Sequence, residues 1–596
     1  MSLRAFELNS TPRNPNKQSF GEDAMAIRTD VLVIGAGGAG ARAAIEAAQN
    51  PQLRILILNQ GPVGKSGLTA MANGGMQWVS HPEDSPRYIF EDIVRIGCFL
   101  NDQNLIEVLS EEAPARAQEL IDWGAKPLAF EDRRGGGPSP DSPGGGPSYP
   151  RAHLIPGVSY MAALRNQLER LPNVTVIEDV LVTKLLRRNK RIIGATMLNI
   201  RTGECEAIEA KATVLAAGGL GELYPHSTNA PFGMHGHAAG MGYAMAYHAG
   251  AELIDMEMVQ FTGNQLWPPW LLGNPALLVT LCGGEYRNAL GQEFIKLPQP
   301  RDAIQRLAYK EIKEGRGTER GGVYIDLTVS PLSSQEIEEQ LKSSLAAQVA
   351  KERWKLIKAM SADTPDPKTW KIEFTPGGAH FFMGGVRINE RCETNLKGFY
   401  AAGEVSGGVH GANRMGGNAL TEIIVFGARA GRYAAEYATE NEWVESDESS
   451  LKEESERLNR FFKSRGTAPK ILMDRIAALM LENAGVARTE AGLMKALSAI
   501  ESMKADNLQN LRAPQGRRFN LGWIEAIQVP CMLDVAEMIV RAALLRTESR
   551  GAHCREDFAE TQSEWLKHTR ILKIGEAMDV GSAPVVITRL NPEVSK

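Results

Sequence analysis

Three glycines near the N-terminus have the spacing of a dinucleotide-binding turn. Gly35, Gly37 and Gly40 form the pattern G-x-G-x-x-G. In such a turn the first glycine permits the tight bend, the second lets the backbone approach a pyrophosphate, and the third lets a helix pack closely on a strand. The N–H groups and the dipole of the helix N-terminus bind the phosphates. The spacing therefore predicts a binding site for a dinucleotide cofactor.

The segments around these glycines are the elements that must position them. An apolar run at residues 31–34 precedes the pattern, an alanine-rich helical stretch to residue 49 follows it, and a second apolar run occupies residues 55–58. This order predicts a strand, a turn, a helix and a second strand. A short glycine pattern is weak evidence in a chain with 59 glycines, so the prediction depends on this context.

The end of the second predicted strand departs from the usual pattern. An acidic residue there, about 20 positions beyond the glycines, ordinarily binds a ribose hydroxyl. This chain has Asn59 and Gln60 instead. An amide can still accept a hydrogen bond, so Asn59 remains a candidate for cofactor binding. No arginine follows it for a 2′-phosphate, and the sequence gives no support to NADP.

Composition and charge exclude several classes of protein. The 596 residues are 43% hydrophobic and 23% charged, as in soluble globular proteins, and the length predicts several domains. A net charge of −5 without a block of like charge argues against nucleic acid or an anionic membrane as the main partner. No stretch reaches the roughly 18 to 20 apolar residues of a bilayer span, so we expect no direct membrane insertion. The six cysteines form no Cys-x-x-Cys pair, so we expect no metal site.

The rest of the chain divides by composition. Residues 1–29 are polar and carry no secretory signal, which predicts a loose leader on a cytoplasmic protein. Residues 132–148, with six glycines and four prolines, predict a surface loop. Apolar runs broken by turns between residues 174 and 214 predict a small antiparallel meander. Helical periodicity begins beyond residue 447.

Several longer segments resemble the flavoprotein subunits of succinate dehydrogenase and fumarate reductase. The likeness begins at residues 62–76, which resemble the family's flavin-contacting loop. It recurs in VLAAGG (214–219), GMGYAMAYHAGAELIDMEMVQF (240–261), MGG (383–385), GFYAAGE (398–404), VHGANRMGGN (409–418), GVARTE (485–490) and ESRGAH (548–553). These segments span about residues 30–560. In combination they are highly specific, and they identify the chain as similar to this family, which also includes the aspartate oxidases.

The resemblance implies an α/β fold with FAD as the cofactor. The FAD-binding domain would be Rossmann-like and discontinuous, with an inserted α+β capping domain and a C-terminal helical domain. The expected boundaries are a leader at 1–29, the FAD-binding domain at 30–250 and 376–440, the capping domain at 251–375 and the helical domain at 445–596. Together with Asn59, the residues expected to contact FAD are Gly35, Gly37, Gly40, Ser66, Gly74, Gly75, Ala217, Glu404 and Asn418.

The way in which FAD is held is also implied by the likeness. Family members with covalently bound FAD use a histidine six residues before a Gly-Gly pair, and this chain has Leu68 at that position. We therefore expect non-covalent FAD. In this family the covalent link raises the flavin potential. Its absence leans toward alkene reduction, or toward oxidation of a substrate more easily oxidised than succinate.

Two positions match the family's dicarboxylate-binding residues. They are His380 in AHFFMGG and Arg414 in ANRMG. Chemistry of this type moves a hydride between flavin and carbon, while cationic groups hold the carboxylate and stabilise the enolate-like charge that builds up. Arginine suits this role because its planar fork donates two parallel hydrogen bonds. The resemblance thus implies a small carboxylate substrate.

Two other parts of the family's active site are replaced. Where the family reads Phe-His-Pro-Thr, residues 261–264 read FTGN, so a second substrate histidine is absent. The family's Thr-Glu-x-x-Arg-Gly-Glu segment is replaced by residues 279–287, VTLCGGEYR. Arg287 is the candidate for a replacement from a shifted register, with Glu285 and Cys282 as weaker ones. Two tryptophans, Trp267 and Trp270, suggest a pocket for a bulkier or less charged substrate than fumarate.

The leading hypothesis is an FAD-dependent oxidoreductase of succinate dehydrogenase and fumarate reductase type, acting as the catalytic subunit of an assembly. Its electrons would be exchanged with an iron–sulfur partner subunit, through which the cytoplasmic chain could associate with a membrane. The replaced residues motivate a second hypothesis, an electron-transfer flavoprotein that has lost dicarboxylate chemistry. An enzyme similar to the aspartate oxidases, which would use dioxygen, is a third.

Overall fold

The computed structural model describes most of the chain. The described residues are 27–72, 75–127, 148–149, 151–225, 227, 238–262, 265–267, 282–296, 299, 301–344, 359 and 364–592. The expected loop at 132–148 and the expected leader lie almost wholly outside these ranges. Among the described residues, no helix is long and apolar enough to cross a membrane.

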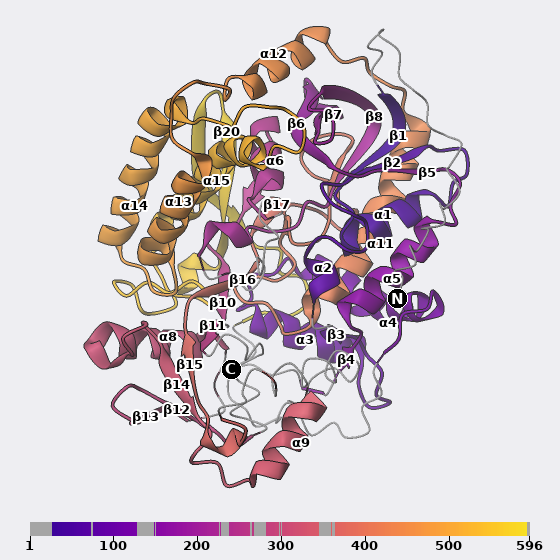
Figure 1. Cartoon of the computed structure of the whole chain (residues 1–596). Helices are drawn as coiled ribbons and strands as arrows, with labels where there is room; N and C mark the ends of the chain where they lie inside the picture. Colours follow the sequence, from indigo (N-terminus) through magenta and orange to yellow (C-terminus); the bar gives the residue numbers. More distant parts are fainter. Residues whose placement is uncertain are drawn as a thin grey trace, which may run out of the picture.

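A parallel sheet built on the first predicted strand organises the molecule (Figure 1). Its central strand pairs with one neighbour in the register Val33 with Ile57 and with the other in the register Val33 with Val214. The parallel strands are β5 (Val174–Ile177), β2 (Ile55–Leu58), β1 (Ile27–Ile34), β8 (Cys205–Leu215) and β18 (Phe399–Ala401). The predicted strands at 31–34 and 55–58 are confirmed, and both are buried apolar runs, as a sheet covered on both faces requires.

The helices that cover this sheet pack at unusually close range. They are α1 (Gly38–Ala47) and α11 (Asn418–Glu440), and α5 (Gly157–Leu168) packs in turn against α1. A Cβ on Gly431 of α11 would lie 2.1 Å from the carbonyl oxygen of Ala43 in α1. Only glycine permits this approach, because any side chain there would collide with backbone. The close packing holds the middle of α11 against α1.

The predicted meander is confirmed as an antiparallel extension of the same sheet. The strands β6 (Val180–Arg188) and β7 (Arg191–Asn199) pair with each other, and β7 pairs with the first half of β8. The segment that precedes them, β5, instead pairs in parallel with β2. Strand β8 therefore joins the meander to the parallel part of the sheet.

A second sheet with a core of its own lies at the opposite end of the molecule from α12 (Figure 1). Its strands, all antiparallel, are β11 (Gln265–Trp267), β15 (Lys371–Thr375), β14 (Val323–Asp326), β12 (Glu285–Arg287) and β13 (Glu293–Ile295). The helices of this region are α8 (Arg301–Glu311) and α9 (Ser334–Ser344). These strands and helices, and the separate core that they enclose, agree with the α+β capping domain that the sequence predicts between the two parts of the FAD-binding domain.

The strands that flank this second sheet in sequence pair elsewhere. Strand β10 (Val259–Thr262) pairs with β16 (Gly378–Phe382), which carries His380. A further sheet has the order β19 (Ser406–Gly407), β17 (Gly385–Arg387), β9 (Leu253–Ile254), β20 (Lys567–Ile574) and β21 (Ala577–Pro584). The chain thus enters and leaves the capping region through neighbouring strands.

The C-terminal region begins as a helical unit, as predicted. Its helices are α12 (Glu448–Asn459), α13 (Pro469–Ala484), α14 (Glu490–Ser502) and α15 (Leu521–Leu545). It ends differently from the sequence-based expectation of helices alone, because β20 and β21 form a hairpin that pairs with β9. A strand whose partner is about 315 residues away leaves no local pattern by which to predict its pairing.

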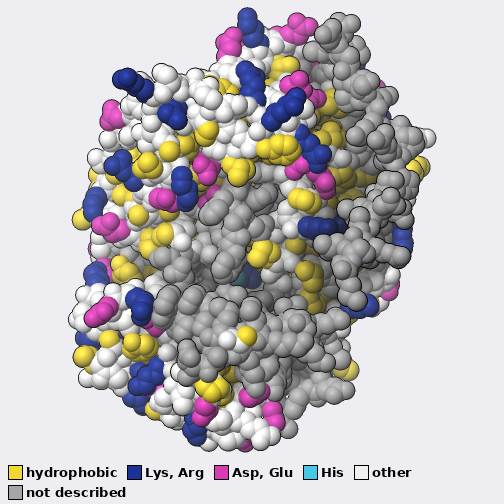
Figure 2. All heavy atoms as spheres, viewed as in Figure 1, with side chains coloured by type: hydrophobic (Ala, Val, Ile, Leu, Met, Phe, Trp, Pro, Cys, Tyr) yellow, Lys and Arg dark blue, Asp and Glu magenta, His cyan; other side chains and the backbone are white. Residues whose placement is uncertain are grey.

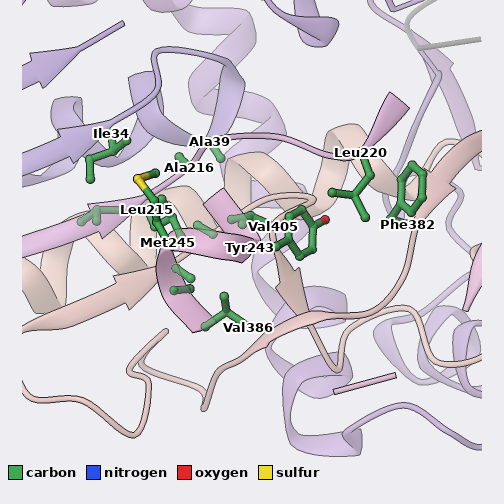
Figure 3. Packing of buried hydrophobic residues seen from close by; sticks show 14 of the residues in the cluster. Ile34, Ala39, Leu215, Ala216, Leu220, Tyr243, Met245, Phe382, Val386 and Val405 are labelled. Carbon is green, nitrogen blue, oxygen red and sulfur yellow. The ribbon is translucent and has the colours of Figure 1, made fainter. Parts of the chain in front are cut away.

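The remaining elements surround the end of the main sheet. They are α2 (Leu68–Met71), β3 (Gly75–Gln77), α3 (Pro86–Ile96), α4 (Gln103–Asp122), β4 (Ala152–Leu154) and α6 (Met241–Ala249). Figure 3 shows Ile34, Leu215 and Met245 gathered where β1, β8 and α6 meet. On the surface, Figure 2 shows basic and acidic side chains interspersed over the described part of the visible face, in line with the small net charge.

Candidate cofactor and substrate site

A cavity lies at the carboxyl ends of the parallel strands, where open α/β sheets bind their ligands. It begins just beyond Ile34 of β1 and Leu215 of β8. Its lining comes from residues 34–39, 58–60, 66–69, 72, 180–182, 216–218, 239–242, 245, 381, 402–404, 419–420 and 423. Six predicted cofactor residues are among them: Gly35, Gly37, Asn59, Ser66, Ala217 and Glu404.

The three glycines of the turn have separate structural roles. Gly35 has φ = +97°, and a Cβ there would lie 2.4 Å from the carbonyl oxygen of Ala216. A Cβ on Gly40 would lie 1.9 Å from the carbonyl oxygen of Gly35, so Gly40 serves the packing of α1 against the turn. A Cβ on Gly37 would meet nothing closer than Thr69 Oγ1, at 3.8 Å, and Gly37 lines the cavity. Gly37 is therefore the glycine that leaves room for a ligand.

Asn59 braces the turn in the place of the usual acid. Its Oδ1 accepts a hydrogen bond from the N–H of Ala36 at 2.9 Å, and its Nδ2 donates to Ser66 Oγ at 3.1 Å. The Ser66 hydroxyl donates its own hydrogen to the Pro62 carbonyl at 2.7 Å, so it can only accept from residue 59, and an amide can donate to it where a carboxylate could not. The amide thus ties the glycine turn to the loop that faces it.

Thr69 is a site residue that the sequence reasoning missed. Helix α1 begins after Gly37, which has no side chain with which to cap it. The Thr69 hydroxyl instead accepts a hydrogen bond from the N–H of Gly38 at 3.1 Å. A hydroxyl residue just after the Lys65-Ser66-Gly67 segment was the available signal, but its partner in α1 is 31 positions away.

Glu404 holds the cavity wall and is only weakly acidic. Its Oε1 accepts a hydrogen bond from the N–H of Phe382 at 3.1 Å, and its carbonyl accepts one from the Tyr243 hydroxyl at 2.5 Å. Burial raises the pKa of Glu404 to about 7. This carboxyl therefore fixes the end of β16, the strand that carries His380.

Glu422 and His410 are two neighbouring buried residues of the site that the sequence analysis did not predict. Burial, with a smaller contribution from the neighbouring Glu404 carboxyl, raises the pKa of Glu422 to about 8. Burial, together with the nearby Arg414, lowers the pKa of His410 well below its usual value. Glu422 Oε2 and His410 Nε2 lie 4.0 Å apart, yet both groups are neutral near pH 7. They are therefore not an ion pair.

The strand that carries His380 runs beside Arg414. His380 is the extra residue of a β-bulge, because Gln260 pairs with Phe381 while the next residue, Phe261, pairs with Ala379. Bulges re-aim side chains and are frequent near active sites. Phe381, directly after His380, lines the cavity, and the Arg414 guanidinium carbon lies 4.7 Å over its ring. The cofactor cavity and Arg414 thus adjoin at Phe381, the residue that follows His380.

Of the three remaining predicted cofactor residues, Asn418 and Gly75 lie beside the cavity and Gly74 lies outside the described residues. The side chain of Asn418, the first residue of α11, is buried, and neither its oxygen nor its nitrogen has a hydrogen-bond partner within the described ranges. A Cβ on Gly75 would lie 3.5 Å from Gly417, so β3 runs next to the start of α11. Gly74 and Trp270 lie outside the described residues, as do 263–264 and 268–281.

Arg287 lies in the capping sheet. On β12 its guanidinium donates to Glu285 Oε2 and to the Gly291 carbonyl, both at 2.5 Å. Both partners belong to the β12–β13 hairpin and its turn, and Arg287 is not among the residues of the cavity wall. A catalytic role of Arg287 stays a prediction. Among the described residues, no group of three or more His, Cys, Asp or Glu is arranged to hold a metal ion.

Comparison with known proteins defines the class first. A model described as "FAD binding domain" matches residues 30–420, and one described as "Fumarate reductase flavoprotein C-term" matches residues 473–596. Fold and site thus define an FAD-dependent oxidoreductase. More narrowly, the chain belongs to the family of fumarate reductase and succinate dehydrogenase flavoprotein subunits.

Individual relatives resemble the chain over nearly its full length. A fumarate reductase (CoM/CoB) subunit of Methanothermobacter marburgensis is 38% identical over 570 residues, covering 93% of this chain and 98% of the relative. The fumarate reductase flavoprotein subunit of a Serratia strain is 31% identical over 601 residues, with 94% and 95% covered. The solved Sdh1 of Mycobacterium smegmatis has a TM-score of 0.82 at 31% identity, covering 95% and 96%. FrdA of Escherichia coli quinol fumarate reductase has the same TM-score at 28% identity, covering 95% and 98%.

The residues of the cavity fit FAD, the cofactor of this family. Gly37 leaves open space at the start of α1, where backbone N–H groups suit a pyrophosphate. The buried amide of Asn418, without a partner in the described structure, is a polar group that a bound ligand would satisfy. Asn59 and Ser66 stand on one wall, and Glu404 stands on another. These residues would hold the cofactor between the glycine turn and the start of α11.

Proposed function

We propose that this chain is the FAD-carrying catalytic subunit of a multi-subunit fumarate reductase, which reduces the carbon–carbon double bond of a small unsaturated carboxylate. The observation that carries the proposal is the junction at Phe381, where Arg414 lies over a ring that also lines the cofactor cavity. Relatives named as fumarate reductase subunits support it at 38% and 31% identity.

The reaction adds two electrons and two protons to the substrate. A hydride adds to one carbon of the double bond and a proton to the other. Bound FAD, once reduced by two electrons from a partner subunit, would supply the hydride, and an acidic group at the site would supply the proton, for which Arg287 stays the predicted candidate. Arg414 would bind a carboxylate of the substrate through its planar fork and stabilise the negative charge that develops next to that carboxylate. His380 would hold the substrate from the bulge in β16. Both residues act by binding and orienting.

Electrons would reach the flavin from a partner subunit with iron–sulfur clusters. Among the described residues of this chain there is no grouping of metal ligands that could hold such a cluster. The Methanothermobacter relative carries CoM/CoB in its name, so thiol coenzymes are candidate electron donors to the assembly. We further propose that FAD is bound non-covalently, since Leu68 lines the cavity where covalent members of the family have histidine.

Fumarate reduction with a reduced viologen dye tests the main proposal. The purified, FAD-loaded chain should reduce fumarate, and Arg414→Ala should lower kcat/KM by about a thousandfold, because the charged fork acts on the transition state as well as the substrate. FAD content should stay unchanged. Arg187→Lys is the matched control, because Arg187 donates to the Ala249 carbonyl at 2.8 Å and is not part of the cavity wall. Full activity in Arg414→Ala would contradict the proposal.

A second function has its own supporting observation. Thr262 occupies the position of the family's second substrate histidine, and its buried hydroxyl has no hydrogen-bond partner in the described structure. This favours an electron-transfer flavoprotein that has lost dicarboxylate chemistry, or an enzyme similar to the aspartate oxidases. No turnover with fumarate, aspartate or larger unsaturated acids would support the first of these. Turnover of an isolated monomer with dioxygen alone would support the second.

A further inference from the structure

A buried glutamine contacts both the backbone and the side chain of Arg414. Gln260 lies on β10 opposite Phe381 of β16, and only 3% of its surface is exposed. Its Oε1 accepts a hydrogen bond from Arg414 Nε at 3.2 Å. Its Nε2 donates to the Arg414 carbonyl at 3.0 Å and to Asn413 Oδ1 at 2.8 Å. The oxygen and the nitrogen of the Gln260 amide thus both bind the segment that contains Asn413 and Arg414.

These contacts determine how the guanidinium is oriented. The Phe381 ring bounds one face of the guanidinium plane, with its central carbon 4.7 Å from the ring centre. The bond from Nε to Gln260 fixes the rotation of that plane about the side chain. A third contact, from Nη1 to the Met415 carbonyl, is long at 3.4 Å and constrains the group less. Of these two hydrogen bonds from the guanidinium, the one to Gln260 is the shorter and restrains the orientation of the fork more.

We infer that Gln260 is a positioning residue that holds Arg414 ready for a substrate carboxylate. The inference rests on the proposed function, in which Arg414 binds that carboxylate. A bidentate fork binds tightly only when its plane is already set, because otherwise binding must supply the cost of ordering a long side chain. Without the amide, Arg414 Nε and Asn413 Oδ1 would lose buried hydrogen-bond partners, and the fork would turn about its own axis.

Two substitutions test the inference on the FAD-loaded protein. Gln260→Leu removes both hydrogen-bonding ends at similar size, and we expect KM for fumarate and Kd for the unreactive dicarboxylate malonate to rise about tenfold. Gln260→Glu keeps the shape but sets a carboxylate against the guanidinium, so the rise should be larger. It should also shrink toward acidic pH, where the new carboxyl takes up a proton and pairs less strongly with Arg414. FAD content should be unchanged in both variants.

The matched control is Gln103→Leu. Gln103 is also a fully buried glutamine, but its amide binds the C-terminal tail, accepting from the N–H groups of residues 588–590. This variant should lower the melting temperature and leave KM and Kd for the dicarboxylates unchanged. The pH-dependent KM of Gln260→Glu is a readout that a purely structural role would not move.

The failure of the inference can be distinguished from the failure of the proposed function. If the unsubstituted protein neither reduces fumarate nor binds malonate, the proposed function fails, and the inference fails with it. If the unsubstituted protein does both and the Gln260 variants match it in KM, in Kd and in the pH dependence of KM, the inference alone is overturned. If Gln260→Leu does not fold, Gln260→Glu decides by the pH dependence of its KM.

Discussion

Glu422 and His410 lie 4.0 Å apart beside the candidate site, and neither is charged near neutral pH. The Glu422 carboxyl accepts the N–H of Gly403 at 3.0 Å, next to Glu404. Two weakly acidic carboxyls and a neutral imidazole thus surround one permanent cation, Arg414, which contributes to the shifts of all three groups. At the residue scale, the charges in this site cannot be read from the residue types alone, because burial shifts the pKa of each of these groups toward its neutral form.

We expect the stability of the flavin-free protein to fall with pH through Glu422. The pKa of this group is near 4.5 when exposed and about 8 in the folded protein. Between these pH values the folded state holds the proton and the unfolded state does not, so the free energy of unfolding falls as pH rises from about 4.5 through about 8. Urea unfolding at pH 6 and pH 9 should show this fall. Glu422→Gln should reduce it, and an unchanged pH dependence would contradict the assignment.

The cofactor should separate from the denatured protein. Leu68 has no nucleophilic atom with which to form a bond to the flavin ring, and it stands in the cavity wall at the position that is histidine in covalent members of the family. Precipitating the yellow holoprotein with acid should leave the FAD in the supernatant and the pellet colourless. Flavin fluorescence that stays with the protein band on a denaturing gel would show a covalent link from another residue.

At the scale of elements, the glycines of the turn from β1 into α1 serve two purposes, which are close packing of the helix and open space for a ligand. Gly40 is needed because α1 approaches the turn closely, and Gly37 leaves the open space beside the helix N-terminus in which we propose that FAD binds. The turn is then braced from outside by Asn59 and Thr69, which come from the second strand and from α2. The local sequence specifies the turn, and neighbouring elements hold it in shape.

Alanine substitution should separate the two requirements. Gly40→Ala places a methyl group 1.9 Å from the Gly35 carbonyl, so the helix must move, at a cost of about 1–3 kcal/mol in the free energy of unfolding. Gly37→Ala meets nothing within 3.8 Å and should leave the flavin-free protein about as stable as before, while its methyl group occupies ligand space and raises Kd for FAD. Melting curves without FAD and FAD titrations measure both. Equal effects of the two substitutions on both quantities would contradict the division of roles.

At the scale of the whole molecule, a buried ionic network joins the C-terminal region to the substrate strands. Arg546, at the end of α15, is fully buried and donates to Glu257 at 2.6 Å and to Glu548 at 3.0 Å. Glu257 lies directly before Met258 and β10, the strand that carries Gln260. The nearby Asp255 forms a hydrogen bond with His568 of β20, with 2.5 Å between Asp255 Oδ2 and His568 Nδ1. The C-terminal hairpin and α15 thus support the loop that leads into the candidate substrate site.

Removing the cation of this network while leaving its carboxylates in place should destabilise the folded protein. Arg546→Met leaves the buried Glu257 carboxylate without its cation, whereas Glu548 keeps its ion pair with Arg550. We expect the free energy of unfolding to fall by about 3–5 kcal/mol. Lys495→Met is the control, because Lys495 pairs with Glu482 on the surface with both side chains more than 60% exposed. It should change stability by less than about 1 kcal/mol. Denaturant midpoints measure both, and similar effects would mean that the network contributes little.

The sequence predicted the parts of the site that neighbours along the chain specify. The strands at 31–34 and 55–58, and the glycine turn between them, follow from spacing over fewer than 30 residues. The family resemblance placed Glu404 and Ser66 in the cofactor site, and the structure brings both to the cavity wall. It gave no means of finding Glu422 or His410 as site residues, and for Thr69 it gave only a place in the flavin-contacting loop, because each acts through a contact with a distant segment.

What the sequence by itself determined is the α/β class, the dinucleotide turn and membership of a flavoprotein family, since these depend on local periodicity and on motifs. Only the tertiary structure decided that His380 stands in a bulge, that Gln260 holds Arg414 from 154 positions away, and that β20 pairs with β9. The physical reason is that local geometry is fixed by short-range sterics and hydrogen bonds. The surroundings of a buried side chain are fixed only when segments far apart in the chain pack together and exclude water.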